Sequence, residues 1–217
     1  TTLFHYLSLP EQVALAGCPV ADPGLIRMLG ARRTRPLQCR VAAAGNPACP
    51  ADMLWDFLKH RCPVRASLAR NPALPGALLE ALCQDDMWKV RVQVALRTTL
   101  SEALFDQLAA DSDWHVRKSL AVHPSLPEPI KDALVYDPYY RVREALAARE
   151  DLGEDRLAVM ADREKGPTVL CVVILNPCTA LSALEKHHST RDFGIQDALG
   201  EAYRRQQGSP GEHYRAY

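Results

Sequence analysis

The sequence repeats itself with a period of 26 residues over much of its length. A Val-Arg pair recurs at this interval, and an apolar residue followed by alanine comes four residues after each valine of these pairs. The pairs are Val64-Arg65, Val90-Arg91, Val116-Arg117 and Val142-Arg143. Looser copies extend on both sides and give about seven units between residues 11 and 194. A fixed period of this kind predicts a stack of repeats, or solenoid, rather than a single globular core.

Each unit is expected to contain two short helices and no strand. The longer piece, for example residues 75–83, places Leu78, Leu79 and Leu82 at helical spacing. The shorter piece begins at the Val-Arg pair and ends at an Asn-Pro pair, because the residue before proline avoids the helical conformation. The sustained alternation of apolar and polar residues that is typical of strands does not occur.

The pattern VRxxLAxNPxLPxxLLxxLxxD, best seen at residues 64–85, resembles the leucine-rich repeat variant family. The resemblance covers about residues 39–180. It implies an all-α fold, a right-handed superhelical solenoid of alternating α- and 3₁₀-helices. Two units depart from the pattern, because Arg97-Thr98 and Arg149-Glu150 replace Asn-Pro.

The cysteines fall into two groups. Four of the seven lie in the first 62 residues: Cys18, Cys39, Cys49 and Cys62. A proline follows each of these except Cys39. Their spacing holds no C-x2-C and is by itself a weak metal signature. The repeat register strengthens it, because stacked units would bring the four sulfurs to one end of the solenoid. The other three occupy small-residue positions and are expected to pack in the core: Cys83, Cys171 and Cys178.

The cysteine-rich stretch resembles the iron–sulfur segment that precedes the repeats in leucine-rich repeat variant proteins. This resemblance implies a [4Fe–4S] cluster held by the thiolates of Cys18, Cys39, Cys49 and Cys62. Two alternatives stay open. The same thiolates would also suit a zinc ion, and free cysteines often act simply as small buried hydrophobes.

These features divide the chain into three parts. Residues 1–63 are predicted to form a small N-terminal iron–sulfur cluster domain, residues 64–194 the helical repeat domain, and residues 195–217 a polar C-terminal tail. The first part holds seven Lys/Arg against four Asp/Glu. This excess of positive charge would either adjust the potential of an anionic cluster or form a solvated basic loop. That excess gathers at Arg32, Arg33, Arg35 and Arg40.

The arginines of the Val-Arg pairs would form a ladder along one face of the stack: Arg65, Arg91, Arg117 and Arg143. Such a ladder offers phosphate or an acidic partner a row of guanidinium groups. However, Asp85, Asp111 and Asp137 recur at the same period. Arg–Asp pairs at the repeat junctions are therefore the favoured interpretation.

Signatures of catalysis are absent: there is no nucleophile elbow, phosphate loop or dinucleotide fingerprint, so we expect no enzyme activity. We expect a [4Fe–4S] protein with a redox or sensor role and a solenoid surface that binds another protein. One alternative is a non-redox scaffold whose N-terminal metal only caps the fold. Another is a nucleic-acid-binding repeat that uses the Arg ladder, which is less favoured because Lys+Arg and Asp+Glu both number 26.

The expected location is the cytoplasm. No signal peptide or membrane-spanning apolar run is visible, and cysteine clusters in a reducing compartment indicate metal sites or free thiols. We expect a monomer without membrane contact.

Overall fold

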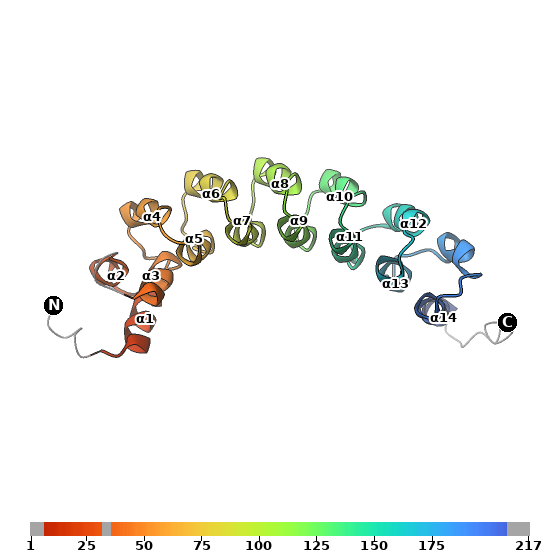
Figure 1. Cartoon of the computed structure of the whole chain (residues 1–217), viewed down its shortest axis with the longest axis horizontal. Coiled ribbons are helices and arrows are strands. Elements are labelled where there is room, and N and C mark those ends of the chain that lie inside the picture. Colours follow the sequence, from red (N-terminus) through yellow and green to blue (C-terminus); the bar gives the residue numbers. More distant parts are fainter. Residues whose placement is uncertain (1–6, 32–35, 208–217) are drawn as a thin grey trace. The chain divides into compact units, whose positions relative to one another are not determined.

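The computed structural model describes residues 7–31 and 36–207, so the basic group at Arg32, Arg33 and Arg35 lies outside the described residues. Within the described ranges every regular element is a helix (Figure 1). Contacts between Cα atoms divide the chain into two units, residues 1–116 and 117–217. The helix α9 (Trp114–Ala121) begins in unit 1 and ends in unit 2.

Unit 1 contains two rows of helices. Its helices are α1 (Leu9–Gly17), α2 (Pro23–Gly30), α3 (Leu37–Ala44), α4 (Ala51–Phe57), α5 (Cys62–Ala69), α6 (Gly76–Cys83), α7 (Trp88–Ala95) and α8 (Glu102–Ala109). The helices that carry the Val-Arg position stack on one another, α3 on α5 and α5 on α7, and α1 continues this row against α3. We call this the Val-Arg row. The helices α4, α6 and α8 form the second row (Figure 1).

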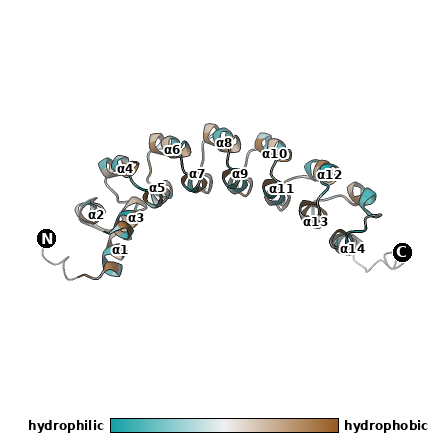
Figure 2. Cartoon of the chain, in the orientation of Figure 1, coloured by the Kyte–Doolittle hydropathy of each residue, from teal (hydrophilic) through white to brown (hydrophobic). Residues whose placement is uncertain are grey.

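Unit 2 continues the same alternation. Its helices are α10 (Glu128–Leu134), α11 (Tyr140–Ala147), α12 (Glu154–Arg163), α13 (Pro167–Leu175), the 3₁₀-helix η2 (Leu181–His187) and α14 (Phe193–Gln207). Here α11, α13 and α14 pack in succession, while α12 contacts η2. The strongly apolar α13 is brown in Figure 2, and it is covered by α11, α12 and α14. A helix that is apolar all round must be buried in this way.

The repeated apolar positions form the core, as the period predicts. Val64, Leu68 and Ala69 in α5 are all 0% exposed, and so are Val90 and Val94 in α7. The small alanine at the end of each motif lets neighbouring helices approach closely, while the branched side chains fill the space between them. The core is therefore a series of similar layers.

One expectation about the secondary structure is corrected. Alternating α- and 3₁₀-helices were expected, yet both helices of each complete repeat are α-helices, and η2 is the 3₁₀-helix of the described residues. The reason is that the short pieces still close i→i−4 hydrogen bonds: Arg65 N–H donates to Arg61 O at 3.3 Å, and Leu79 N–H to Pro75 O at 3.1 Å.

The predicted segment boundaries also differ from the structure. The boundary at residues 63 and 64 falls inside α5. Residues 195–207, expected in a polar tail, belong to α14. Its apolar residues follow helical spacing and are buried: Ile195, Ala198, Leu199 and Ala202. No helix among the described residues is long and apolar enough to span a membrane.

Candidate functional site

Buried asparagines tie three of the repeat turns to the repeat before them: Asn46, Asn71 and Asn176. The Asn71 side chain is 0% exposed, and its Nδ2 donates to the carbonyl oxygens of Ala44 (3.0 Å) and Asn46 (2.7 Å). Its Oδ1 accepts the N–H of Ala73 at 2.9 Å. Asn46 binds the carbonyls of the α1 turn in the same way, and Asn176 binds those of the α11 turn. One side chain thus satisfies three buried backbone groups.

Arginine performs this task in the two units that lack Asn-Pro. Arg97 Nη1 donates to Ala69 O at 2.7 Å and to Asn71 O at 2.8 Å. Arg149 Nη1 donates to Ala121 O at 3.0 Å and to His123 O at 2.7 Å. The longer side chain reaches the same pair of carbonyl groups, so the departure from the sequence pattern preserves the contact. The sequence signalled these positions only through their register.

A histidine replaces asparagine in a further unit. His123 is 2% exposed, and its Nδ1 lies 3.0 Å from the N–H of Ser125. Nδ1 accepts this hydrogen bond, so the imidazole supplies the acceptor that the asparagine oxygen supplies in other turns. His123 thus reproduces the contact that Asn71 makes through Oδ1 with Ala73.

The predicted Arg–Asp pairs form, and each is bidentate. Nε and Nη2 of Arg65 bind the two carboxylate oxygens of Asp85 at 2.5 and 2.8 Å. Equivalent pairs join Arg91 to Asp111, Arg117 to Asp137 and Arg143 to Glu164. The last partner was missed in the sequence, because it is a glutamate placed 21 residues after its arginine rather than 20.

These pairs are largely withdrawn from solvent. The four arginine side chains are between 11% and 19% exposed, and their acidic partners between 3% and 8%. A third donor is also used, since Nη1 of Arg65 donates to His60 O at 2.7 Å and Nη1 of Arg91 to Asp85 O at 2.6 Å. The guanidinium groups of this ladder therefore have few N–H donors left to bind phosphate.

The Asp85 carboxylate also begins the next repeat by accepting the N–H of Met87 at 2.9 Å. Burial by itself would raise the pKa of Asp85, but the hydrogen bonds from Arg65 and Met87 outweigh it and hold this pKa below its ordinary value. Asp85 is therefore a junction residue that holds its arginine and the following helix together.

The four N-terminal cysteines lie on helices that contact one another. Cys18 follows the last residue of α1, and Cys39 is the third residue of α3. Cys49 precedes α4, and Cys62 begins α5. Cys39 and Cys49 are buried, at 0% and 8% exposed, while Cys18 and Cys62 are partly exposed.

The register divides these cysteines into two pairs. Cys18 and Cys49 both lie at the turn held by Asn46. The Asn46 side-chain Nδ2 donates to Cys18 O at 2.8 Å, and the Asn46 backbone carbonyl accepts the Cys49 N–H at 3.0 Å. Cys39 and Cys62 lie at the starts of the stacked helices α3 and α5. The seven residues from Cys39 to Asn46 span roughly 10 Å along a helix.

A zinc ion holds its thiolates at about 2.3 Å, and a cluster likewise needs four thiolates around one centre. Among the described residues, no group of three or more His, Cys, Asp or Glu side chains is placed to hold a metal ion. The four thiols therefore do not fit either group as they are arranged here. The four cysteines lie on or next to the first helices, α1, α3, α4 and α5, and form two pairs there rather than one group. The cluster ligand set stays a prediction.

Thiol reactivity should reveal these environments. Burial raises the pKa of Cys49 to about 11 from an ordinary 9.0, and it raises the pKa of Cys83 equally. This lowers the thiolate fraction about 100-fold at neutral pH, so iodoacetamide at pH 8 should modify Cys18, Cys62 and the exposed Cys178 well before them. Mass spectrometry of the alkylated peptides measures the order.

Urea-unfolded protein provides the control, since all thiols should then react alike. Rapid labelling of folded Cys49 would contradict the assignment. The raised pKa values of Cys49 and Cys83 also affect stability. The contribution of these two protonated thiols to the free energy of unfolding is fully present below pH 9.0 and is lost as the pH rises towards about 11.

Cys178 does not pack in the core as expected, because its Sγ lies at the surface, 3.1 Å from Glu150 O.

Comparison with known proteins agrees with the repeat architecture. A family model described as leucine rich repeat variant matches residues 64–87. A solved structure described as "a leucine-rich repeat variant with a novel repetitive protein structural motif" matches with a TM-score of 0.65 at 24% identity, covering 84% of this chain and 72% of that one. The fold is that of a leucine-rich repeat variant. No match was found among curated proteins.

The leucine-rich repeat variant fold confirms the interpretation of the 26-residue period. The matched residues 64–87 begin after Cys62, so the family model does not include the cysteine-rich stretch. The fold therefore explains the Arg–Asp and asparagine contacts, whereas the iron–sulfur segment stays a prediction.

Proposed function

We propose that this leucine-rich repeat variant fold is a non-catalytic scaffold whose stacked helices bind another protein. The observation that carries the proposal is the separation of exposed charge between α5 and α7 of the Val-Arg row and α6 and α8 of the second row. On α5, α7 and their flanking residues the exposed cations are Arg61, Arg70 and Lys89. On α6 and α8 the exposed acids are Glu80, Glu102 and Asp106. Stacked repeats commonly use such an extended face for recognition.

The charge difference favours a partner with an acidic surface at the Val-Arg row. Asp86, in the turn before α7, is already bound to Arg65 and does not cancel Arg70 or Lys89. At the end of α7, Leu96 is 53% exposed and adds an apolar contact beside these cations. Electrostatic complementarity of this kind steers association and selects partners.

Photo-cross-linking tests this surface. A photoreactive residue at Leu96 should give a protein adduct in cells, and the adduct should resist nuclease. The matched control is Ala103, which is exposed on α8 in the acidic row and should give little adduct. An adduct that nuclease removes, or equal yields at the two positions, would contradict the proposal.

We further propose that Cys18, Cys39, Cys49 and Cys62 bind a [4Fe–4S] cluster with a redox or sensor role after a rearrangement of the N-terminal repeats. Their position on or next to contacting helices and the proline after three of them support it. The burial of Cys49 opposes it in part, because the ligand must be a thiolate.

Anaerobic reconstitution with iron and sulfide tests cluster binding. We expect broad visible absorption that dithionite bleaches and about four irons per chain. Cys39→Ala should abolish the colour, whereas Cys171→Ala, on α13, should keep it. A colourless protein that takes up one zinc ion would favour the zinc alternative, and loss of colour in Cys171→Ala would refute the ligand assignment.

A further inference from the structure

Unit 1 shows how a repeat junction accommodates an aromatic ring. The His115 imidazole stacks on the Trp88 indole with centroids 4.2 Å apart and planes 13° apart. On Trp114 the centroid distance is 3.6 Å. Trp88 begins α7, and His115 is the second residue of α9. The second residue of α9 thus stacks on the first residue of α7, the helix that carries the preceding Val-Arg pair.

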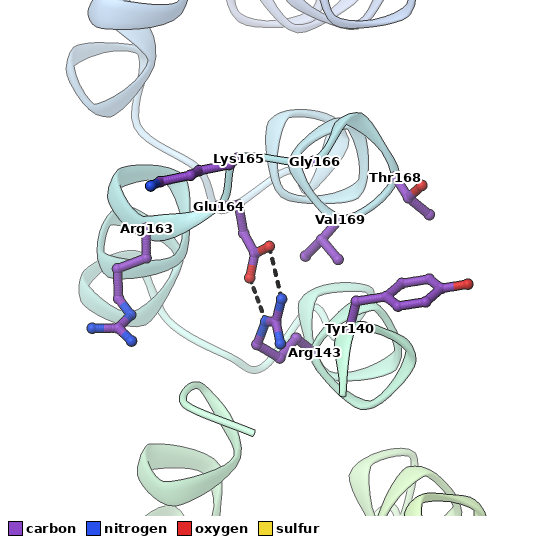
Figure 3. Close-up of a pocket in the computed structure, with 8 residues that line it drawn as sticks. All are labelled: Tyr140, Arg143, Arg163, Glu164, Lys165, Gly166, Thr168 and Val169. Carbon is purple, nitrogen blue, oxygen red and sulfur yellow. Dashed lines mark hydrogen bonds and ion pairs between the residues drawn. The ribbon is translucent and has the colours of Figure 1, made fainter. Parts of the chain in front are cut away.

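The junction between α11 and α13 in unit 2 has the same register, but it has no aromatic ring at the position of His115. Tyr140 begins α11, in the place of Trp88, and Thr168 is the second residue of α13, in the place of His115. A cavity of about 400 Å³ occupies this junction, and Tyr140, Gly166, Thr168 and Val169 are among the residues that line it (Figure 3). We call it the ring site. Its volume falls within the range of small-ligand pockets, roughly 300–1,000 Å³.

The ring site is accessible and has room for a side chain. Tyr140 is 40% exposed, and a Cβ added at Gly166 would meet no atom within 4 Å. Figure 3 shows Tyr140, Thr168 and Val169 to one side of the Arg143–Glu164 ion pair. The Tyr139 ring lies beside the Tyr140 ring, with centroids 5.6 Å apart, and the Arg141 guanidinium lies 5.8 Å from the Tyr140 centroid. A ligand ring would stack on the part of the phenol ring that these two side chains leave exposed.

The charged lining of the cavity is net positive. Glu164 neutralises Arg143, with oxygen–nitrogen distances of 2.5 and 3.1 Å. Arg163 and Lys165 remain, on the other side of this pair (Figure 3). The Arg163 guanidinium is held over the Tyr136 ring, 4.6 Å from its centroid. Carboxylates close to an aromatic ligand would meet these two cations.

We propose that the ring site binds an aromatic side chain from an acidic segment of a partner protein. The proposal rests on the protein-binding function above and assigns it one site. The partner's ring stacks on Tyr140, as His115 stacks on Trp88, and flanking carboxylates face Lys165 and Arg163. Nucleic acid is less suited, because Glu164 occupies the Arg143 guanidinium and the chain carries no net positive charge.

Fluorescence anisotropy with the full chain tests the ring site. The probe is a short fluorescein-labelled peptide in which glutamates flank one tryptophan. Thr168→His places the missing imidazole on Tyr140 and should weaken binding at least about tenfold, equal to a loss of about 1.4 kcal/mol. Thr168→Ser keeps the cavity and should bind as the wild type does. Lys165→Glu should weaken binding and reduce its salt dependence.

Further variants keep the test decisive if Thr168→His does not fold. Tyr140→Phe keeps the ring and should retain binding, whereas Tyr140→Ala should lose it. Replacing the peptide's tryptophan by alanine, or its glutamates by glutamines, should also weaken binding. Binding that Thr168→His leaves unchanged, or tighter binding of a single-stranded oligothymidine, would overturn the proposal. Photo-cross-linking from Leu96 tests protein binding separately. If the cross-linking succeeds and the peptide does not bind, the ring site is rejected and the protein-binding function stands.

Discussion

Replacing Arg65 by alanine is expected to lower the free energy of unfolding by about 3–5 kcal/mol. The Asp85 carboxylate, whose side chain is 6% exposed, would lose both guanidinium hydrogen bonds and keep the one from Met87. The carbonyl of His60 would lose a donor as well. A buried charge without its counter-ion costs more than the pair itself contributes. Urea unfolding at pH 7 measures the loss.

The pH dependence gives this prediction a second readout. Because the folded-state pKa of Asp85 is lowered, the contribution of the pair is present above the unfolded carboxyl pKa of about 3.9 and is lost as the pH falls through the folded value. The difference between wild type and Arg65→Ala should therefore shrink in acid.

The exposed Arg70 is the matched control, and Arg70→Ala should change stability by less than about 0.5 kcal/mol. Replacing Asp85 by leucine in the Arg65→Ala background should recover part of the loss, because the unpaired charge is removed. A loss below about 0.5 kcal/mol for Arg65→Ala at pH 7, or one unchanged by pH, would contradict the junction role.

Asn71→Ala is expected to cost about 3 kcal/mol. The substitution removes donors from two carbonyl groups and an acceptor from the Ala73 N–H, all at a position that is 0% exposed. Asn71→Asp should be at least as harmful, because it keeps the acceptor but turns a carboxylate towards carbonyl oxygens. Thermal and urea unfolding of the purified variants measures both losses.

Asn71→His supplies the discriminating variant. His123 shows that an imidazole accepts the equivalent N–H, from Ser125, in a turn of this fold. We therefore expect Asn71→His to lose less stability than Asn71→Ala. Equal losses for the two variants would mean that the volume of the side chain matters at this position rather than its hydrogen bonds.

Much of the repeat body was predictable from local pattern. The period placed Val64, Leu68 and Ala69 in the core, and the recurrence of Asp85 predicted its pair with Arg65. The apolar spacing that buries Ile195 and Leu199 in α14 was also visible, but the polar residues around it led to the prediction of a tail. Local spacing should have outweighed composition there.

The turns and the cysteines were predicted less well. The equivalence of Asn71, Arg97 and His123 rests on which backbone groups the side chains reach, and three different residue types meet that requirement. For the cysteines the register placed all four in the first repeats, but it did not show that Cys18 lies at a turn while Cys39 lies near the start of a helix. The direction of the helices separates them.

The sequence by itself determined that the chain is a stack of short helix pairs, because a period of 26 residues repeats the same buried face and the same Arg–Asp junction. Only the tertiary structure decided what lies between the repeats. It revealed the asparagine, arginine and histidine contacts to carbonyl groups, the separation of the N-terminal thiols into two pairs and the ring site beside Tyr140. The physical reason is that a repeat specifies its own helices locally, whereas hydrogen bonds, thiol positions and cavities depend on how one repeat meets the next.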